Sequence, residues 1–160
     1  MKIRNWQYLE KYLSKEYDFL QTFRSGAIFG DCDLFKKFGH LKISIEAKFS
    51  KQNLFSTTFK FWDFYKGLHQ SNRSDVFVLA YGTTENILFF VYTENIVIQS
   101  YLDNLISQSI DIKKDSGQFT INYTTKSTYI KTNSFNMYCL NIDNFDSFIK
   151  WINDNHGKCY

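Results

Sequence analysis

The sequence predicts an α/β (α+β) protein in which helices flank a central mixed sheet. Residues 41–49 alternate apolar and polar side chains, which is typical of a strand with two distinct faces. Residues 76–81 and 87–92 are short apolar runs, as expected of two buried strands that pair with each other. Residues 6–20 carry apolar side chains at helical spacing and predict an amphipathic first helix.

Two further strands are expected between the first helix and the alternating strand. Residues 23–28 form a short segment that ends among glycines and predict a strand leading into a turn, and residues 32–35 predict the strand that follows. Gly39 and His40 mark a turn that closes this strand and leads into the alternating one. Thr57 or Thr58 is expected to cap a helix with aromatic residues over 61–68. The core therefore has the predicted order αβββαβ.

The C-terminal part predicts a smaller set of elements. Residues 95–108 are expected to form a helix, residues 119–123 and 135–142 a pair of strands, and residues 144–153 a last helix. No linker or low-complexity segment divides the chain. We therefore expect one domain over residues 1–160, with a core over about 6–92 and an αββα extension over about 93–160.

Composition predicts a soluble protein of a reducing compartment. No apolar run approaches the length that crosses a bilayer, and the N-terminus does not resemble a signal peptide. The three cysteines are scattered, so they predict neither a disulfide framework nor a zinc site. Abundant Asn, Lys, Ile, Tyr and Phe are typical of an A/T-rich genome. The expected location is the cytoplasm, or the host cytoplasm if the source is a phage or another virus.

Positive charge is concentrated in one segment. Residues 34–73 contain eight basic residues against two acidic ones, whereas the whole chain carries a net charge of only +3. A basic sector on an otherwise mildly acidic chain is what binding of a polyanion requires. An ordinary solvated lysine face would give the same count.

The residues that predict chemistry lie around the alternating strand. Glu46 and Lys48 share its polar face, because their side chains are two residues apart. A hairpin around Gly39 would bring Asp33 beside Glu46. Two neighbouring carboxylates repel each other unless a cation joins them, and hard oxygen ligands suit Mg²⁺. We therefore expect Mg²⁺ here, with Mn²⁺ able to substitute. The ion would polarise a phosphodiester. Lys48 would orient the water that attacks the phosphodiester, or neutralise the negative charge that develops on it.

Three alternatives accompany this prediction. Asp31 precedes Asp33 by two residues and is the second candidate for the metal ligand. Asp111 and Lys113 repeat the acid-x-Lys spacing but lack an acidic turn before them, so we interpret this pair as a chance occurrence. For Asp33, Glu46 and Lys48 themselves, the structural alternative is a surface hairpin with a salt bridge.

Residues 6–81 resemble the nuclease core of the PD-(D/E)xK superfamily, and within it the Holliday-junction resolvases of the archaeal and phage type. The residues that carry the resemblance are Glu10, Arg24-Ser25-Gly26, Asp33-Leu34 and Ile45-Glu46-Ala47-Lys48. The Pro-Asp pair usual in the family is absent here, so Gly30-Asp31 or Cys32-Asp33 must take its place. Glu16 competes with Glu10, but the spacing from Glu10 to Arg24 suits the family better.

The resemblance implies a restriction-endonuclease-like fold and a metal-dependent DNA endonuclease. It implies that Asp33, Glu46 and Glu10 bind the metal and, with Lys48, form the catalytic set. Arg24 and Ser25 are expected to bind a backbone phosphate, and Lys51 and Gln52 to contact DNA after the catalytic strand. The expected substrate is branched or four-way DNA, cleaved by a homodimer whose twofold axis matches paired scissile phosphates.

Other functions share part of this pattern. A restriction-type or a recombination or repair nuclease of the same superfamily would use the same core residues. A catalytically silent DNA-binding module, or an immunity-type interaction protein, would retain the fold without hydrolysis.

Overall fold

The computed structural model describes residues 5–21, 33–51, 57–60, 74–106, 110–115, 118–123, 127–131 and 136–157. The elements in these ranges, in chain order, are α1 (Asn5–Tyr17), β1 (Leu20–Gln21), β2 (Leu34–Phe38), β3 (Leu41–Phe49), β4 (Thr57–Lys60), β5 (Val76–Gly82), β6 (Ile87–Thr93), α3 (Ile96–Leu105), β7 (Ile110–Asp115), β8 (Gln118–Tyr123), β9 (Thr128–Lys131), β10 (Asn136–Leu140) and α4 (Ile142–His156).

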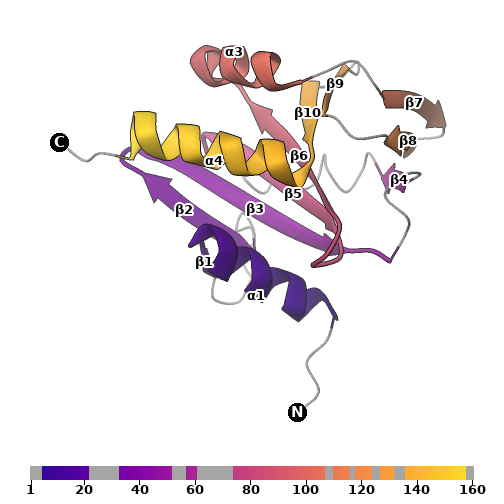
Figure 1. The fold of residues 1–160 in the computed structure, drawn as a ribbon, viewed down its shortest axis with the longest axis horizontal. Coiled ribbons are helices and arrows are strands. Elements are labelled where there is room, and N and C mark those ends of the chain that lie inside the picture. Colours follow the sequence, from indigo (N-terminus) through magenta and orange to yellow (C-terminus); the bar gives the residue numbers. More distant parts are fainter. Residues whose placement is uncertain are drawn as a thin grey trace.

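The described strands form two sheets (Figure 1). Seven strands follow the order β1-β2-β3-β5-β6-β10-β9, and three others the order β4-β8-β7. Within the larger sheet β3 and β5 run parallel, whereas its other neighbouring strands run antiparallel. The predicted class, a mixed sheet flanked by helices, is confirmed.

The alternating segment forms β3 with the predicted bounds. Leu41, Ile43, Ile45 and Ala47 are buried, as one face of a strand requires. Gly39 has a φ of 62°, a left-handed conformation that glycine adopts without strain, in the turn between β2 and β3. The resulting antiparallel register runs from Phe38 opposite Leu41 to Leu34 opposite Ile45. The predicted hairpin is therefore present.

Helices α1 and α4 pack on the same face of the larger sheet, and α4 crosses β5 and β6 in Figure 1. Leu9 and Leu13 of α1 belong to the same buried cluster as Phe145 and Phe148 of α4. The rings of Phe89 and Phe145 stack with centroids 3.8 Å apart and an interplanar angle of 3°. This shared core fixes α1 against the strands that carry the candidate site.

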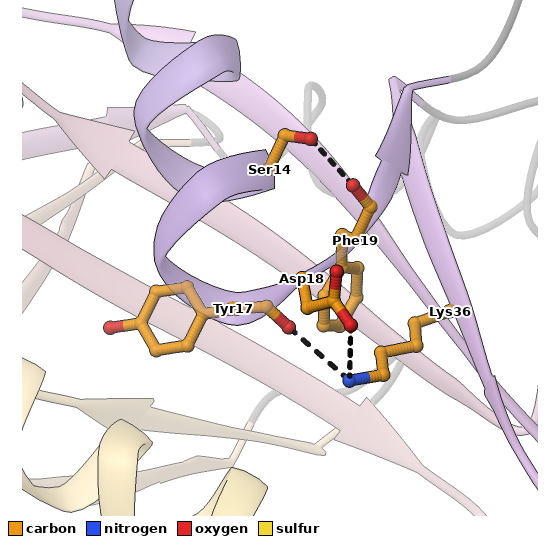
Figure 2. Close-up of polar contacts among 5 residues, drawn as sticks. All are labelled: Ser14, Tyr17, Asp18, Phe19 and Lys36. Carbon is orange, nitrogen blue, oxygen red and sulfur yellow. Dashed lines mark hydrogen bonds and ion pairs between the residues drawn. The ribbon is translucent and has the colours of Figure 1, made fainter.

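Helix α1 ends at Tyr17, earlier than the predicted residue 20. Asp18 has a φ of 59°, which ends the helical path, and the backbone N–H of Phe19 donates to the carbonyl of Ser14 at 3.1 Å. Figure 2 shows the hydroxyl of Ser14 donating back to the Phe19 carbonyl at 2.5 Å. It also shows Lys36 of β2 donating to the Tyr17 carbonyl at 3.5 Å and lying 3.7 Å from the Asp18 carboxylate. The chain then turns into β1, which pairs with β2.

The prediction of a helix N-cap at Thr57 or Thr58 is wrong. Thr57–Lys60 form β4, which pairs with β8 in the smaller sheet. A strand that runs through these threonines leaves neither of them at a helix start. The helix predicted over 61–68 and the strand predicted over 23–28 lie outside the described residues.

The C-terminal part differs from the predicted αββα order. The predicted pairing of residues 119–123 with 135–142 is wrong, because β8 pairs with β4 and β7, whereas β10 pairs with β6 and β9. The physical reason is burial: the four residues from Met137 to Leu140 are all buried, so β10 needs a neighbour on each side. The extension contains two further strands, β7 and β9, whose short or charged sequences lack a clear alternation.

The two C-terminal helices begin at asparagine caps. The side chain of Asn95 accepts from the N–H of Ile98 at the start of α3. The side chain of Asn141 accepts from the N–H of Asn144, so α4 starts two residues before its predicted start and continues to His156. Within the described ranges, the helices are too short or too polar to cross a membrane.

Candidate active site

The β2–β3 hairpin brings Asp33 against the carboxyl-terminal half of β3. Asp33 immediately precedes β2, and its side-chain Oδ2 accepts from the backbone N–H of Ala47 at 2.9 Å. Only 9% of Asp33 is exposed. A carboxyl group this buried is held by the backbone bond and has little room to turn into solvent. The hairpin thus fixes the position of Asp33 beside Glu46.

Two other carboxyl groups meet Asp33 from different elements. Glu46 extends from β3, and Glu10 extends from α1; each lies close enough to Asp33 that the charge of Asp33 and hydrogen bonding to it raise its pKa. Glu10 follows the buried Leu9 on the helix, so the packing of α1 sets where its side chain lies. Glu16 is exposed and lies near Tyr12 and Tyr17 instead. Of the two candidate helix residues, the structure therefore brings Glu10 to the cluster.

The cluster perturbs its own protonation. Burial, then the charge of Asp33, then the hydrogen bond to Asp33 raise the pKa of Glu10 to about 8. The same three causes raise the pKa of Glu46 to about 8, and Glu10 adds to them, whereas Lys48 acts in the opposite direction. Carboxyl groups that share one buried site retain protons at neutral pH unless a cation replaces those protons.

Lys48 supplies a positive charge at the edge of this cluster. Its side chain is exposed and shares a strand face with Glu46, whose pKa it lowers. The register partner of Lys48 on β5 is Tyr81, which is half-buried. Nothing in the local sequence marks Tyr81 as a neighbour of Lys48, because no local signal shows that β3 and β5 run parallel with this register.

The donor atoms of the cluster suit a hard divalent cation, but the side chains are not yet placed as ligands. As they lie, no three of the described His, Cys, Asp or Glu residues form a group that holds a metal ion. Burial and mutual repulsion raise the pKa values of Glu10 and Glu46, so the cluster holds protons that a bound cation would replace.

Several predicted residues lie elsewhere or outside the described ranges. Lys51 is exposed and lies just beyond the end of β3. Asp111 and Lys113 belong to β7 in the smaller sheet, not to the sheet that carries the cluster. The residues outside the described ranges are the alternative ligand and three expected DNA contacts: Asp31, Arg24, Ser25 and Gln52.

No protein-family model and no curated protein sequence matches this chain. A solved structure that matches is that of Hjc, a Holliday junction resolvase from the archaeal hyperthermophile Archaeoglobus fulgidus. The match has a TM-score of 0.38 and 9% sequence identity, and it covers 69% of this chain and 83% of that chain. So loose a likeness says nothing about activity, whereas the carboxyl cluster and Lys48 are features of this chain itself.

Proposed function

We propose that this protein is a metal-dependent DNA endonuclease of the PD-(D/E)xK type that acts on branched DNA. The observation that supports the proposal is the meeting of Glu10, Asp33 and Glu46 from three elements, with Lys48 beside them. Three carboxyl groups in one partly buried place do not stabilise the folded state, because each loses hydration and is repelled by the others. Such a cluster is therefore better explained by a functional role.

The residues divide into metal ligands and a charged neighbour. Glu10, Asp33 and Glu46 would hold Mg²⁺, or Mn²⁺ in its place, through carboxylate oxygens. When bound, the ion would supply positive charge for the scissile phosphate and lower the pKa of a water molecule. Lys48 would orient the attacking water and neutralise charge that develops on the phosphate during hydrolysis.

Exposed positive charge near the cluster supports a polyanionic substrate. Lys48 and Lys51 are exposed near the carboxyl end of β3, beside the cluster, whereas Lys37 is exposed on β2 at the turn end of the hairpin. Other lysines of the hairpin are engaged within the fold: Lys36 pairs with Asp18, and Lys42 lies 5.2 Å from the ring centroid of Phe35. The exposed lysines would contact phosphates and position DNA without reading its sequence.

The branched substrate and the homodimer are the finer parts of the proposal. Four-way junctions present paired scissile phosphates, and a twofold dimer would place one carboxyl cluster at each of them. Cleavage of an immobile four-way junction should then exceed cleavage of a linear duplex of the same arm sequence. Equal cleavage of both substrates would favour a restriction-type or general repair nuclease.

The test compares matched substitutions in a nicking assay with and without Mg²⁺. Glu10→Gln and Glu16→Gln form one pair on α1, and Lys48→Met and Lys37→Met form another on the hairpin. We expect Glu10→Gln and Lys48→Met to reduce the cleavage rate by about 100-fold or more, since each removes charge from the centre. Glu16→Gln should cleave at the rate of the unchanged protein, and Lys37→Met should retain cleavage at saturating protein.

A second measurement separates lost catalysis from lost binding. The substituted proteins should still bind junction DNA in a gel-shift assay, because phosphate contacts outside the cluster remain. Junction binding by the unchanged protein, with no cleavage under Mg²⁺ or Mn²⁺, would identify a silent DNA-binding module. Wild-type cleavage by Glu46→Gln would refute the proposed centre.

A further inference from the structure

A cavity lies at the end of the sheet opposite the carboxyl cluster. Thr93, at the end of β6, is one of the residues that line it. Thr93 pairs with Val76 of β5, and Val76 pairs with Ile43 of β3. Ile43 precedes Glu46 by three residues, so the cavity lies toward the other end of these strands. Its volume is about 280 Å³. The residues that line it come from the neighbouring strands β6, β10 and β9 and from α3, and include Tyr92, Glu94, Gln99, Tyr129, Asn136 and Tyr138.

Three tyrosines line the cavity: Tyr129 and Tyr138 share one face of the sheet, and Tyr92 belongs to the other. The rings of Tyr129 and Tyr138 lie 5.2 Å apart between centroids with an interplanar angle of 52°. The hydroxyl of Tyr138 donates to Oδ1 of Asp103 on α3 at 3.0 Å. The hydroxyl of Tyr92 donates to Oε1 of Glu94 at 2.9 Å. Each of the two hydroxyls thus holds a carboxylate in place while leaving that carboxylate further acceptor positions.

The charged residue among the described residues that line the cavity is acidic. Glu94 lines it, and Asp103 accepts from the lining residue Tyr138, whereas the nearest lysine by strand register is Lys131, opposite Asn136. Burial raises the pKa of Tyr92 and Tyr138 first, and the neighbouring Glu94 and Asp103 raise them further. Asp103 also raises the pKa of Tyr129, after burial. A phosphate-bearing ligand would be repelled here, and a cation would be attracted.

We propose that this cavity binds the cationic head of an organic ligand, a guanidinium or an ammonium group. Faces of aromatic rings attract such cations, and a carboxylate beside the rings neutralises their charge. The volume lies near the lower limit, about 300 Å³, of cavities that hold small ligands, so it suits a head group better than a whole nucleotide. The site would be independent of the proposed nuclease activity, because it shares no residue with the carboxyl cluster.

The test is calorimetric titration of the full-length protein with two cationic probes and one matched neutral probe. The probes are the peptide Gly-Arg-Gly, the polyamine spermidine, and a peptide with citrulline in place of arginine. We expect saturable binding of a cationic probe and binding of the citrulline peptide at least about tenfold weaker, because citrulline keeps the shape and loses the charge. The cationic probe that binds more tightly shows whether the natural cationic group belongs to an arginine side chain of a protein or to a free polyamine.

Matched variants locate the binding. Glu94→Gln should weaken binding by about three- to tenfold, and Tyr129→Leu by a similar factor through loss of a ring face. Glu85→Gln, which neutralises an exposed carboxylate in the β5–β6 turn, should bind as the unchanged protein does. Equal binding of arginine and citrulline peptides, unchanged binding by Glu94→Gln, no saturable binding of either cation, or tighter binding of guanosine monophosphate would overturn the proposal.

Discussion

The metal-free protein should lose stability as the pH rises from about 5 to 8. Glu10 and Glu46 have pKa values raised from 4.5 to about 8 in the folded state, so between these values the folded chain holds protons that the unfolded chain has lost. Stability conferred by a raised carboxyl pKa is fully present below the unfolded value and is lost as the pH rises through the folded value.

The magnitude follows from proton counting. Each additional proton held by the folded state gives a slope of about 1.4 kcal/mol per pH unit. Glu10 and Glu46 are both partly exposed to solvent, which screens the charges around them. Both also owe part of their raised pKa to the same Asp33. The two pKa shifts therefore cannot be added in full when the change in the free energy of unfolding is calculated. After this discount we expect a loss of about 1–2 kcal/mol in the free energy of unfolding between pH 5.5 and 8.

Glu46→Gln isolates the cause, because glutamine mimics the protonated acid without being able to ionise. Urea unfolding with a chelator present should show little difference between Glu46→Gln and the unchanged protein at pH 5.5. At pH 8 the variant should be more stable by about 1 kcal/mol. The matched control Glu16→Gln, at an exposed position of α1, should follow the pH profile of the unchanged protein. The reasoning is refuted if the unchanged protein has the same unfolding free energy at pH 5.5 and 8.

Three further predictions concern metal binding and the elements that support the site. Millimolar Mn²⁺ should raise the melting temperature of the unchanged protein at pH 8 and release protons, whereas Glu46→Gln should show little of either effect; equal shifts would argue against a shared ion. Phe145→Ala should lower the free energy of unfolding by about 3–5 kcal/mol in urea titrations, because it removes a fully buried ring stacked on Phe89; Tyr8→Ala, at an exposed ring, should cost far less. Gly82→Ala should cost at least about 2 kcal/mol, since Gly82 has a φ of 137° and an added Cβ would lie 2.1 Å from the Asn86 carbonyl oxygen; a loss below 0.5 kcal/mol would contradict this geometry.

Local patterns predicted the elements that have one dominant signal. The alternation over residues 41–49 set β3, the turn at Gly39 set the hairpin, and the apolar runs set β5 and β6. In each case a single segment contains both the signal and the structure. The prediction at Thr57 and Thr58 failed, because threonine suits a strand as well as a helix cap, and pairing with β8 decided between them.

The sequence by itself predicted the residue types of the candidate site and a hairpin that would bring Asp33 beside Glu46, with Asp31 as the alternative, because a hairpin joins residues only 13 apart. It did not determine that Glu10 rather than Glu16 reaches Asp33, nor that Tyr81 lies beside Lys48. Those relations depend on how α1 packs on β3 and on the parallel register of β3 and β5. Such contacts join distant segments and leave no local periodic trace, so only the tertiary structure decided them.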